Sequence, residues 1–202
     1  MSALSKNKPR KDLIMTESSV LFWQKGYSDT SMKDIANACG FRPANIYNFF
    51  TNKEEILFEI LFDEMSEIIT EFLTIERNRS GDPVNRLSQL IATHTRLTLS
   101  NRRTSVLLFD VGLGNLSPDN RKKIIALRDE YDRIMAATIR EGIDQGVFSD
   151  MDVKMAVFSI ASMITRTRIW FSDKGRLNVD QVIDFIVQFA LNGLIRKGAP
   201  GN

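Results

Sequence analysis

The 202-residue sequence contains a single cysteine, Cys39, and a single histidine, His94. One cysteine excludes a disulfide framework. One cysteine and one histidine also exclude a zinc site built from these two residue types. No Ser–His or Cys–His pattern of a nucleophilic enzyme is present. We therefore expect no metal, no cofactor and no catalytic residues, and interpret Cys39 as a small core residue.

Long hydrophobic runs are also missing. The longest apolar stretch, residues 155–164, lies between Lys154 and Arg166 and is too short to cross a bilayer. The opening residues MSALSKNKPRK are basic, but no apolar run follows them, so they do not have the pattern of a secretory signal. We expect a soluble cytoplasmic protein with no membrane segment.

The net charge is only +2, but it is unevenly distributed. Residues 1–53 contain eight Lys and Arg against four Asp and Glu, whereas residues 54–202 contain 19 against 21. A basic N-terminal quarter on a mildly acidic body favours a polyanionic partner for that quarter. The plainer alternative is a solvated surface with a basic tail.

Nearly the whole chain has the spacing of helices. No run of strand length alternates apolar with polar residues, and no hairpin turn joins two such runs. We predict an all-α protein of nine helices, at about residues 8–25, 31–38, 43–50, 53–77, 81–100, 104–113, 117–145, 152–171 and 178–197. Capping pairs are expected at two of the early starts: Ser31 with Asp34 at the first, and two candidates at the helix from Lys53, Thr51 with Glu54 and Asn52 with Glu55.

Residues 31–50 have the spacing of a helix-turn-helix motif, with Gly40 in the turn. Its apolar residues are expected to pack with the first helix into one small core: Ile35, Ala36, Phe41, Ile46 and Phe50. The remaining side chains of the second of these helices then face outward: Pro43, Ala44, Asn45, Tyr47 and Asn48. This surface fits a DNA major groove, because Asn bonds adenine, Ala contacts a thymine methyl, and Tyr reaches phosphate oxygens.

Three stretches together resemble the DNA-binding domain of the TetR family: TSMKDIA at 30–36, GFRPANIYNFF at 40–50 and NKEEIL at 52–57. The resemblance covers roughly residues 10–57. It implies a homodimeric repressor, not an enzyme, with a helix-turn-helix DNA-binding domain over 1–56. A helical ligand-binding and dimerisation domain is implied over 57–202.

The same resemblance assigns roles to individual side chains. Pro43, Ala44 and Asn45 correspond to base-contacting positions, and Thr30, Tyr47, Asn48 and Lys53 to phosphate contacts. The N-terminus of the helix that begins at Ser31 offers a positive dipole end to a phosphate. Phe49 stands where Tyr or His is common, which removes one phosphate contact. Arg42 replaces a common Ser or Thr cap, and we include it among the residues that reach DNA.

The last two helices carry apolar residues around more than one face. In the final helix, Val182, Ile183 and Ile186 share one stripe, while Phe185 and Phe189 lie outside it. A surface helix needs a single apolar stripe. We therefore expect one face to pack in the chain's own core and another to form a homodimer. Two central helices of a monomer are the alternative.

An effector site is predicted around Arg166 and Trp170, which are four residues apart and so share a helix face. An arginine beside an indole can hold an anionic or planar group; an ion pair of Arg166 with Asp110 is the alternative. Residues 128–194 loosely resemble TetR-family regulators that sense acyl-CoA thioesters. That resemblance implies an Arg/Trp-lined entrance with an apolar tunnel, and we add His94, Phe109 and Met163 as lining residues.

Two other functions are alternatives to a DNA-binding regulator. One is a helical protein that binds small molecules but no DNA, and the basic N-terminal quarter is the feature that opposes it. The other is an all-helical enzyme, which the lack of any catalytic arrangement opposes.

Overall fold

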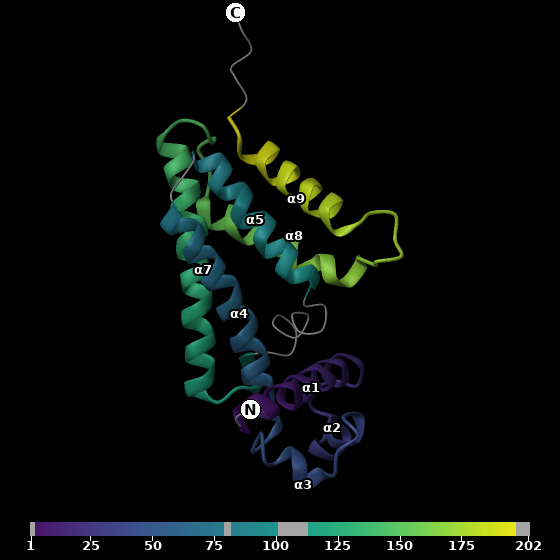
Figure 1. The fold of residues 1–202 in the computed structure, drawn as a ribbon. Coiled ribbons are helices and arrows are strands. Elements are labelled where there is room, and N and C mark those ends of the chain that lie inside the picture. Colours follow the sequence, from purple (N-terminus) through teal and green to yellow (C-terminus); the bar gives the residue numbers. More distant parts are fainter. Residues whose placement is uncertain (1–2, 79–81, 101–112, 197–202) are drawn as a thin grey trace, which may run out of the picture. The chain divides into compact units, whose positions relative to one another are not determined.

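The computed structural model describes residues 3–78, 82–100 and 113–196 (Figure 1). These parts contain eight α-helices, one 3-10 helix and one isolated β-bridge, which confirms the all-α prediction. The elements are α1 (Ala3–Gln24), α2 (Met32–Ala38), α3 (Pro43–Ile46), α4 (Lys53–Asn78), α5 (Pro83–Ser100), η1 (Leu113–Asn115), α7 (Pro118–Asp144), α8 (Val153–Trp170) and α9 (Val179–Leu194). The helix predicted over 104–113 lies, apart from its last residue, outside the described residues. No described helix is long and apolar enough to cross a membrane.

The chain divides into two compact units, and each is described by itself. Unit 1 comprises Met1–Met65 and Arg102–Ala126, and unit 2 comprises Ser66–Asn101 and Leu127–Asn202. The division falls inside α4 and again inside α7. These compact units do not coincide with the predicted functional domains, 1–56 and 57–202. The functional domains stay a prediction.

Unit 1 is built on one apolar core that joins α1, α2, α3 and the start of α4. The predicted residues Ile35, Ala36, Ile46 and Phe50 are buried in it, as expected, and Phe41 packs against it partly exposed. The core also contains residues from distant parts of the chain: Ile14, Phe22, Ile56, Leu57, Leu116 and Ile124. Short helices such as α2 and α3 depend on this packing, because isolated helices of this length are not stable in water.

Two of the three predicted capping pairs form, one at the start of α2 and one at the start of α4. The Ser31 hydroxyl accepts from the Asp34 backbone N–H at 3.1 Å, and Asn52 Oδ1 accepts from the Glu55 N–H at 2.9 Å. The predicted pairing of Thr51 with Glu54 is wrong. The backbone N–H of Thr51 donates to Glu55 Oε2 at 2.6 Å instead.

Two helices are shorter than predicted. α3 ends at Ile46 rather than Phe50, and turn residues follow it. α9 ends at Leu194 because Ile195 adopts extended backbone (φ −61°, ψ 130°) and forms an antiparallel bridge with Phe148. A bridge of single residues leaves no alternating pattern in a sequence, so the prediction could not include it.

In unit 2, α5 packs against α8 and α9, as Figure 1 shows. The end of α7 packs tightly against the segment after it. The ring of Phe148, 1% exposed, occupies the space where a Cβ at Gly142 would lie. Gly142 O also accepts from the backbone N–H groups of Val147 and Phe148, at 2.9 and 3.0 Å. Gly142 is therefore required for close approach, although it lies inside a helix.

We predict that Gly142→Ala destabilises the protein by about 1–3 kcal/mol, because the new methyl group overpacks a filled site. An alanine inside a helix ordinarily stabilises relative to glycine by about 0.5–1 kcal/mol. Gly193→Ala is the matched control, since nothing lies within 4 Å of a Cβ there. Urea unfolding at equal protein concentration measures both variants. A Gly142→Ala protein as stable as the Gly193→Ala protein would contradict this packing.

Candidate functional site

The outer side of α3 carries the side chains that the sequence places on a DNA-reading surface. Pro43, Ala44, Asn45, Tyr47 and Asn48 are all exposed, Tyr47 by 55%. This confirms the predicted orientation of the helix; the contacts with DNA remain predictions. Arg42 precedes the helix, is exposed and makes no side-chain capping bond.

The turn before α3 depends on Gly40. Its φ of +67° lies in the left-handed region that side chains with a Cβ rarely adopt. The chain then returns to α2, where Phe41 N–H donates to Ala36 O at 2.8 Å. This turn sets α3 at an angle to α2 and leaves the α3 face free.

The N-terminus of α2 is closed by a network of bonds. The Ser31 hydroxyl donates to Asp34 Oδ2 at 2.7 Å, and Lys25 Nζ lies 2.9 Å from the same oxygen. These bonds, from Ser31 first and then Lys25, hold the pKa of Asp34 well below its usual value. Ser31 is exposed, but its hydroxyl is engaged. The Ser31 hydroxyl is therefore already used within the cap and is not free to bond a phosphate at this helix end.

Thr30 is not exposed, as the phosphate contact implied by the resemblance would require. Its side chain is 1% exposed, and its hydroxyl donates to Gly26 O at 2.7 Å. The hydroxyl thus closes the turn after α1 from the inside. We do not retain a phosphate contact for the Thr30 side chain.

Lys53 is engaged within unit 1. Its Nζ lies within 2.7 Å of Tyr27 O and 3.0 Å of both Ser28 O and Thr30 O. It also lies 4.5 Å from the centre of the Tyr27 ring. An ammonium group has three donors, so this set of carbonyls accounts for all of them. A phosphate contact by Lys53 would need these bonds to break, and we interpret Lys53 as the residue that fixes the turn before α2.

Glu54 links the beginnings of α4 and α7 within unit 1. Its Oε1 accepts from Ser117 N–H and from Asn120 Nδ2, both at 3.0 Å. Desolvation raises the pKa of Glu54, but the hydrogen bonds from Ser117 and Asn120 outweigh it and keep the pKa below its usual value. No sequence signal indicated this contact or that of Lys53, because each joins residues far apart in the chain.

A buried polar cluster lies inside unit 2. His94, 5% exposed, has Nδ1 3.0 Å from the Tyr131 hydroxyl, and Phe72 stacks on Tyr131 with ring centres 5.2 Å apart. Burial, and then the positive charge of Arg168, lower the pKa of His94 to about 3, so the ring is neutral at neutral pH. One turn along α5, the buried Thr98 hydroxyl has no hydrogen-bond partner among the described residues. Leaving such a hydroxyl unpaired costs about 1–3 kcal/mol.

The other predicted effector residues are placed differently. Arg166 and Trp170 are both exposed on α8, Trp170 by 57%, and Met163 is half-buried. Phe109, like the alternative ion-pair partner Asp110, lies outside the described residues. The arginine that acts on the buried cluster is Arg168. It follows the inward residues Ile160 and Ile164 at steps of four, a spacing that could have indicated its inward position.

The described residues contain no group of three or more side chains that could hold a metal ion.

Two family models match the chain. One, for bacterial regulatory proteins of the tetR family, matches residues 14–60, and the other, for the tetracyclin repressor-like C-terminal domain, matches residues 80–194. The chain belongs to the TetR family. It is thus a transcriptional regulator of this family and not an enzyme, as the sequence predicts.

Known TetR-family proteins resemble the chain along most of its length. The HTH-type transcriptional repressor KstR2 of Mycobacterium tuberculosis is 22% identical over 191 residues, 94% of both proteins. The structure of PfmR from Thermus thermophilus is 34% identical with a TM-score of 0.78 and covers 91% of this chain and 99% of its own. AibR, solved with isovaleryl coenzyme A and operator DNA, is 26% identical with a TM-score of 0.76, covering 89% and 97%.

The role of Lys53 gives a prediction that separates a structural from a phosphate-binding lysine. We expect Lys53→Met to lower the free energy of unfolding by about 1–3 kcal/mol, because three buried or turn carbonyls lose their donor. DNA affinity falls as the turn loosens, but the slope of log K against log salt stays unchanged, since no phosphate contact is lost. Unfolding and salt titrations measure the two effects.

Lys33→Met, at an exposed lysine of α2, is the matched control and should leave the free energy of unfolding within about 0.5 kcal/mol of wild type. If Lys53→Met leaves stability intact and reduces the salt slope by about one, Lys53 contacts a phosphate instead.

Proposed function

We propose that this regulator represses transcription as a homodimer that places α3 of each chain in the major groove of operator DNA, and that a small-molecule effector releases it. The observation that carries the proposal is the α3 surface, where the predicted contact residues 43–45, 47 and 48 are all exposed while Ile46 between them is buried in the core. The proposal includes a cytoplasmic location, because operator binding requires access to DNA.

The chemistry of the α3 surface supports reading of bases. Asn45 presents an amide that can bond adenine at two atoms, and Ala44 is small enough to contact a thymine methyl. Tyr47 and Asn48 follow the helix and can bond phosphates on the flanking backbone. Arg42 at the start of the helix adds a positive charge that is not used for capping.

A homodimer through α8 and α9 is supported by the large apolar side chains these helices expose. Phe185 and Phe189 are 64% and 59% exposed on α9, and their rings stack with centres 5.9 Å apart. On α8, Met155 and Ile169 are 59% and 51% exposed. Apolar surface of this extent marks interfaces in soluble proteins. A two-fold dimer would also supply the two reading heads that a palindromic operator needs.

For the effector, the proposal is an acyl-CoA thioester. AibR was solved with isovaleryl coenzyme A, which makes this ligand class a reasonable first choice for a chain of similar sequence and fold. The unpaired Thr98 hydroxyl, one turn along α5 from the His94–Tyr131 pair, offers a hydrogen bond to a carbonyl. The exposed Arg166 and Trp170 offer charge and stacking to a nucleotide. Release then requires that the effector binds better to a conformation that fits the operator poorly.

DNA reading is tested with fragments selected by the wild-type protein from a random pool. Asn45→Ala should cost about 1–3 kcal/mol at the preferred base of each half-site and change which base is preferred. Tyr47→Phe should instead weaken binding to all sequences by about 0.5–1.5 kcal/mol, because only a phosphate bond is lost. Fluorescence anisotropy on operators with single-base changes measures both.

Asn37→Ala on α2 is the matched control for Asn45→Ala and Tyr47→Phe. Every variant should sediment at twice the chain mass of 23.0 kDa. Unchanged affinity and base preference in both α3 variants would refute the assignment.

The effector is tested by release of bound DNA on adding isovaleryl coenzyme A or longer acyl-CoA thioesters. Arg166→Met should abolish release without changing the unfolding midpoint or the DNA affinity, because the arginine is exposed and lies away from α3 in sequence. Arg176→Met, an exposed arginine between α8 and α9, should release DNA like wild type. Undiminished release by Arg166→Met would show that this arginine does not hold the ligand.

A further inference from the structure

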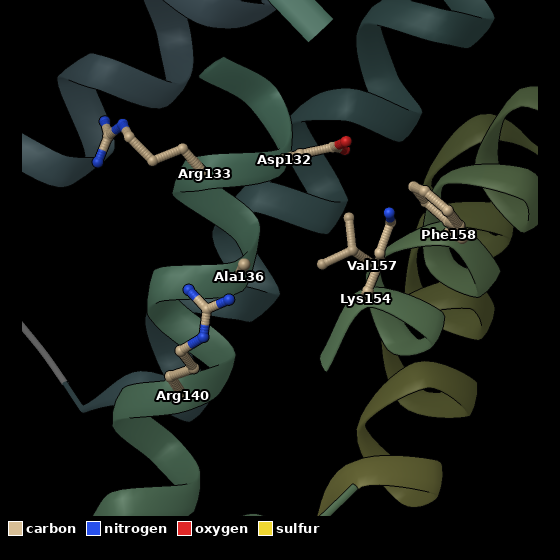
Figure 2. A pocket seen from close by; sticks show the side chains of 7 residues that line it. All are labelled: Asp132, Arg133, Ala136, Arg140, Lys154, Val157 and Phe158. Carbon is tan, nitrogen blue, oxygen red and sulfur yellow. The ribbon is translucent and has the colours of Figure 1, made fainter. Parts of the chain in front are cut away.

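Unit 2 contains a pocket of about 240 Å³ between α7 and α8, apart from the α3 surface and from the predicted effector residues. Its floor is apolar and closed: Ala136 on α7 and Val157 on α8 are 9% and 2% exposed. Around the floor lie charged side chains from both helices and the ring of Phe158, which is 44% exposed (Figure 2).

The charges around this pocket do not cancel. Arg133 is neutralised from elsewhere, because it bonds Glu130 at 2.8 Å and Glu76 at 3.0 Å, and Figure 2 shows it extending away from α8. Arg140 is exposed and has no ion pair or hydrogen bond to any of the described residues. Lys154, from α8, has only Asp132 as an acid in the pocket lining. The pocket lining therefore contains two cations, Arg140 and Lys154, that are not neutralised elsewhere, and one carboxylate.

That carboxylate and the aromatic ring complete the arrangement. Desolvation raises the pKa of Asp132, the positive charges of Arg128 and Lys154 oppose this, and the negative charge of Asp129 adds to it. Lys154 Nζ lies 5.5 Å from the centre of the Phe158 ring, so charge and aromatic surface meet at one edge of the pocket. An apolar floor with cations and one ring at its rim matches a ligand that has a flat apolar body and an anionic end.

We propose that this α7–α8 pocket is a second small-molecule site, which binds an aromatic or similarly flat anion through Arg140 and Lys154. The ligand's body rests on Ala136 and Val157 beside the Phe158 ring. The volume of about 240 Å³ lies below the roughly 300–1,000 Å³ of sites for drug-sized ligands, so the occupant is small. Arg166 follows Phe158, the lining residue nearest to it along α8, by eight positions, which is about 12 Å along the helix axis, so the site is separate from the Arg166 and Trp170 surface.

Phenyl phosphate is a suitable probe, with inorganic phosphate and benzyl alcohol to supply its charge and its ring separately. Isothermal titration of the full chain should give saturable binding of one phenyl phosphate per chain at this pocket, and each partial probe should bind at least roughly tenfold more weakly. Arg140→Gln and Lys154→Gln should each weaken phenyl phosphate about tenfold, as expected when a charged hydrogen bond is lost. Arg121→Gln, an exposed arginine at the other end of α7, should change affinity less than about twofold.

Three results would overturn the proposal. The first is no saturable binding of phenyl phosphate by the folded protein. The second is equal affinity in the wild type and in all three variants, which would place the bound anion elsewhere. The third is a change of sedimenting mass in the Arg140→Gln protein without ligand, which would show that a second copy of the chain fills the pocket. The first two results depend on neither DNA binding nor dimerisation, so they leave the proposed function intact, whereas the third would place part of the dimer interface at this pocket.

Discussion

The burial of Ile46 and Phe50 is the constraint on which the reading surface depends. Both side chains are at most 1% exposed in the core of unit 1, and α3 itself is four residues long without a side-chain cap. A helix this short has no stability of its own. Its outward face is therefore set by what its inward face buries, and Asn45 and Tyr47 are exposed because Ile46 is not.

Around this core, single polar side chains hold the parts of unit 1 in place. Lys53 fixes the turn that leads into α2, Thr30 closes the same turn from inside, and Glu54 ties α4 to the start of α7. Leu116 and Ile124 add apolar contacts from that distant segment to the core. The DNA-reading unit thus includes residues beyond position 113, so a change in that segment has a physical route to α3.

Local patterns in the sequence were enough to predict the eight described helices (apart from the end of α3), the Ser31 capping box and the two faces of α3, because each depends on neighbours within about four residues. The roles of Lys53, Glu54 and Thr30 were not predicted, since their partners lie elsewhere in the chain or are backbone carbonyls that leave no sequence pattern. The same holds for the effector residues. Spacing indicated Arg166, because it lies four residues from Trp170, whereas the arginine whose charge lowers the pKa of buried His94 is Arg168. The DNA contacts and the effector site stay predictions.

The most direct measurement is to map where α3 lies on DNA. Asn45→Cys in a Cys39→Ala background carries the only thiol, to which an iron–EDTA cleavage reagent is attached. The account predicts two cleaved patches in the major groove of the operator, symmetric about its centre and one helical turn or a whole multiple apart. A single patch, or cleavage spread evenly along the fragment, would contradict it.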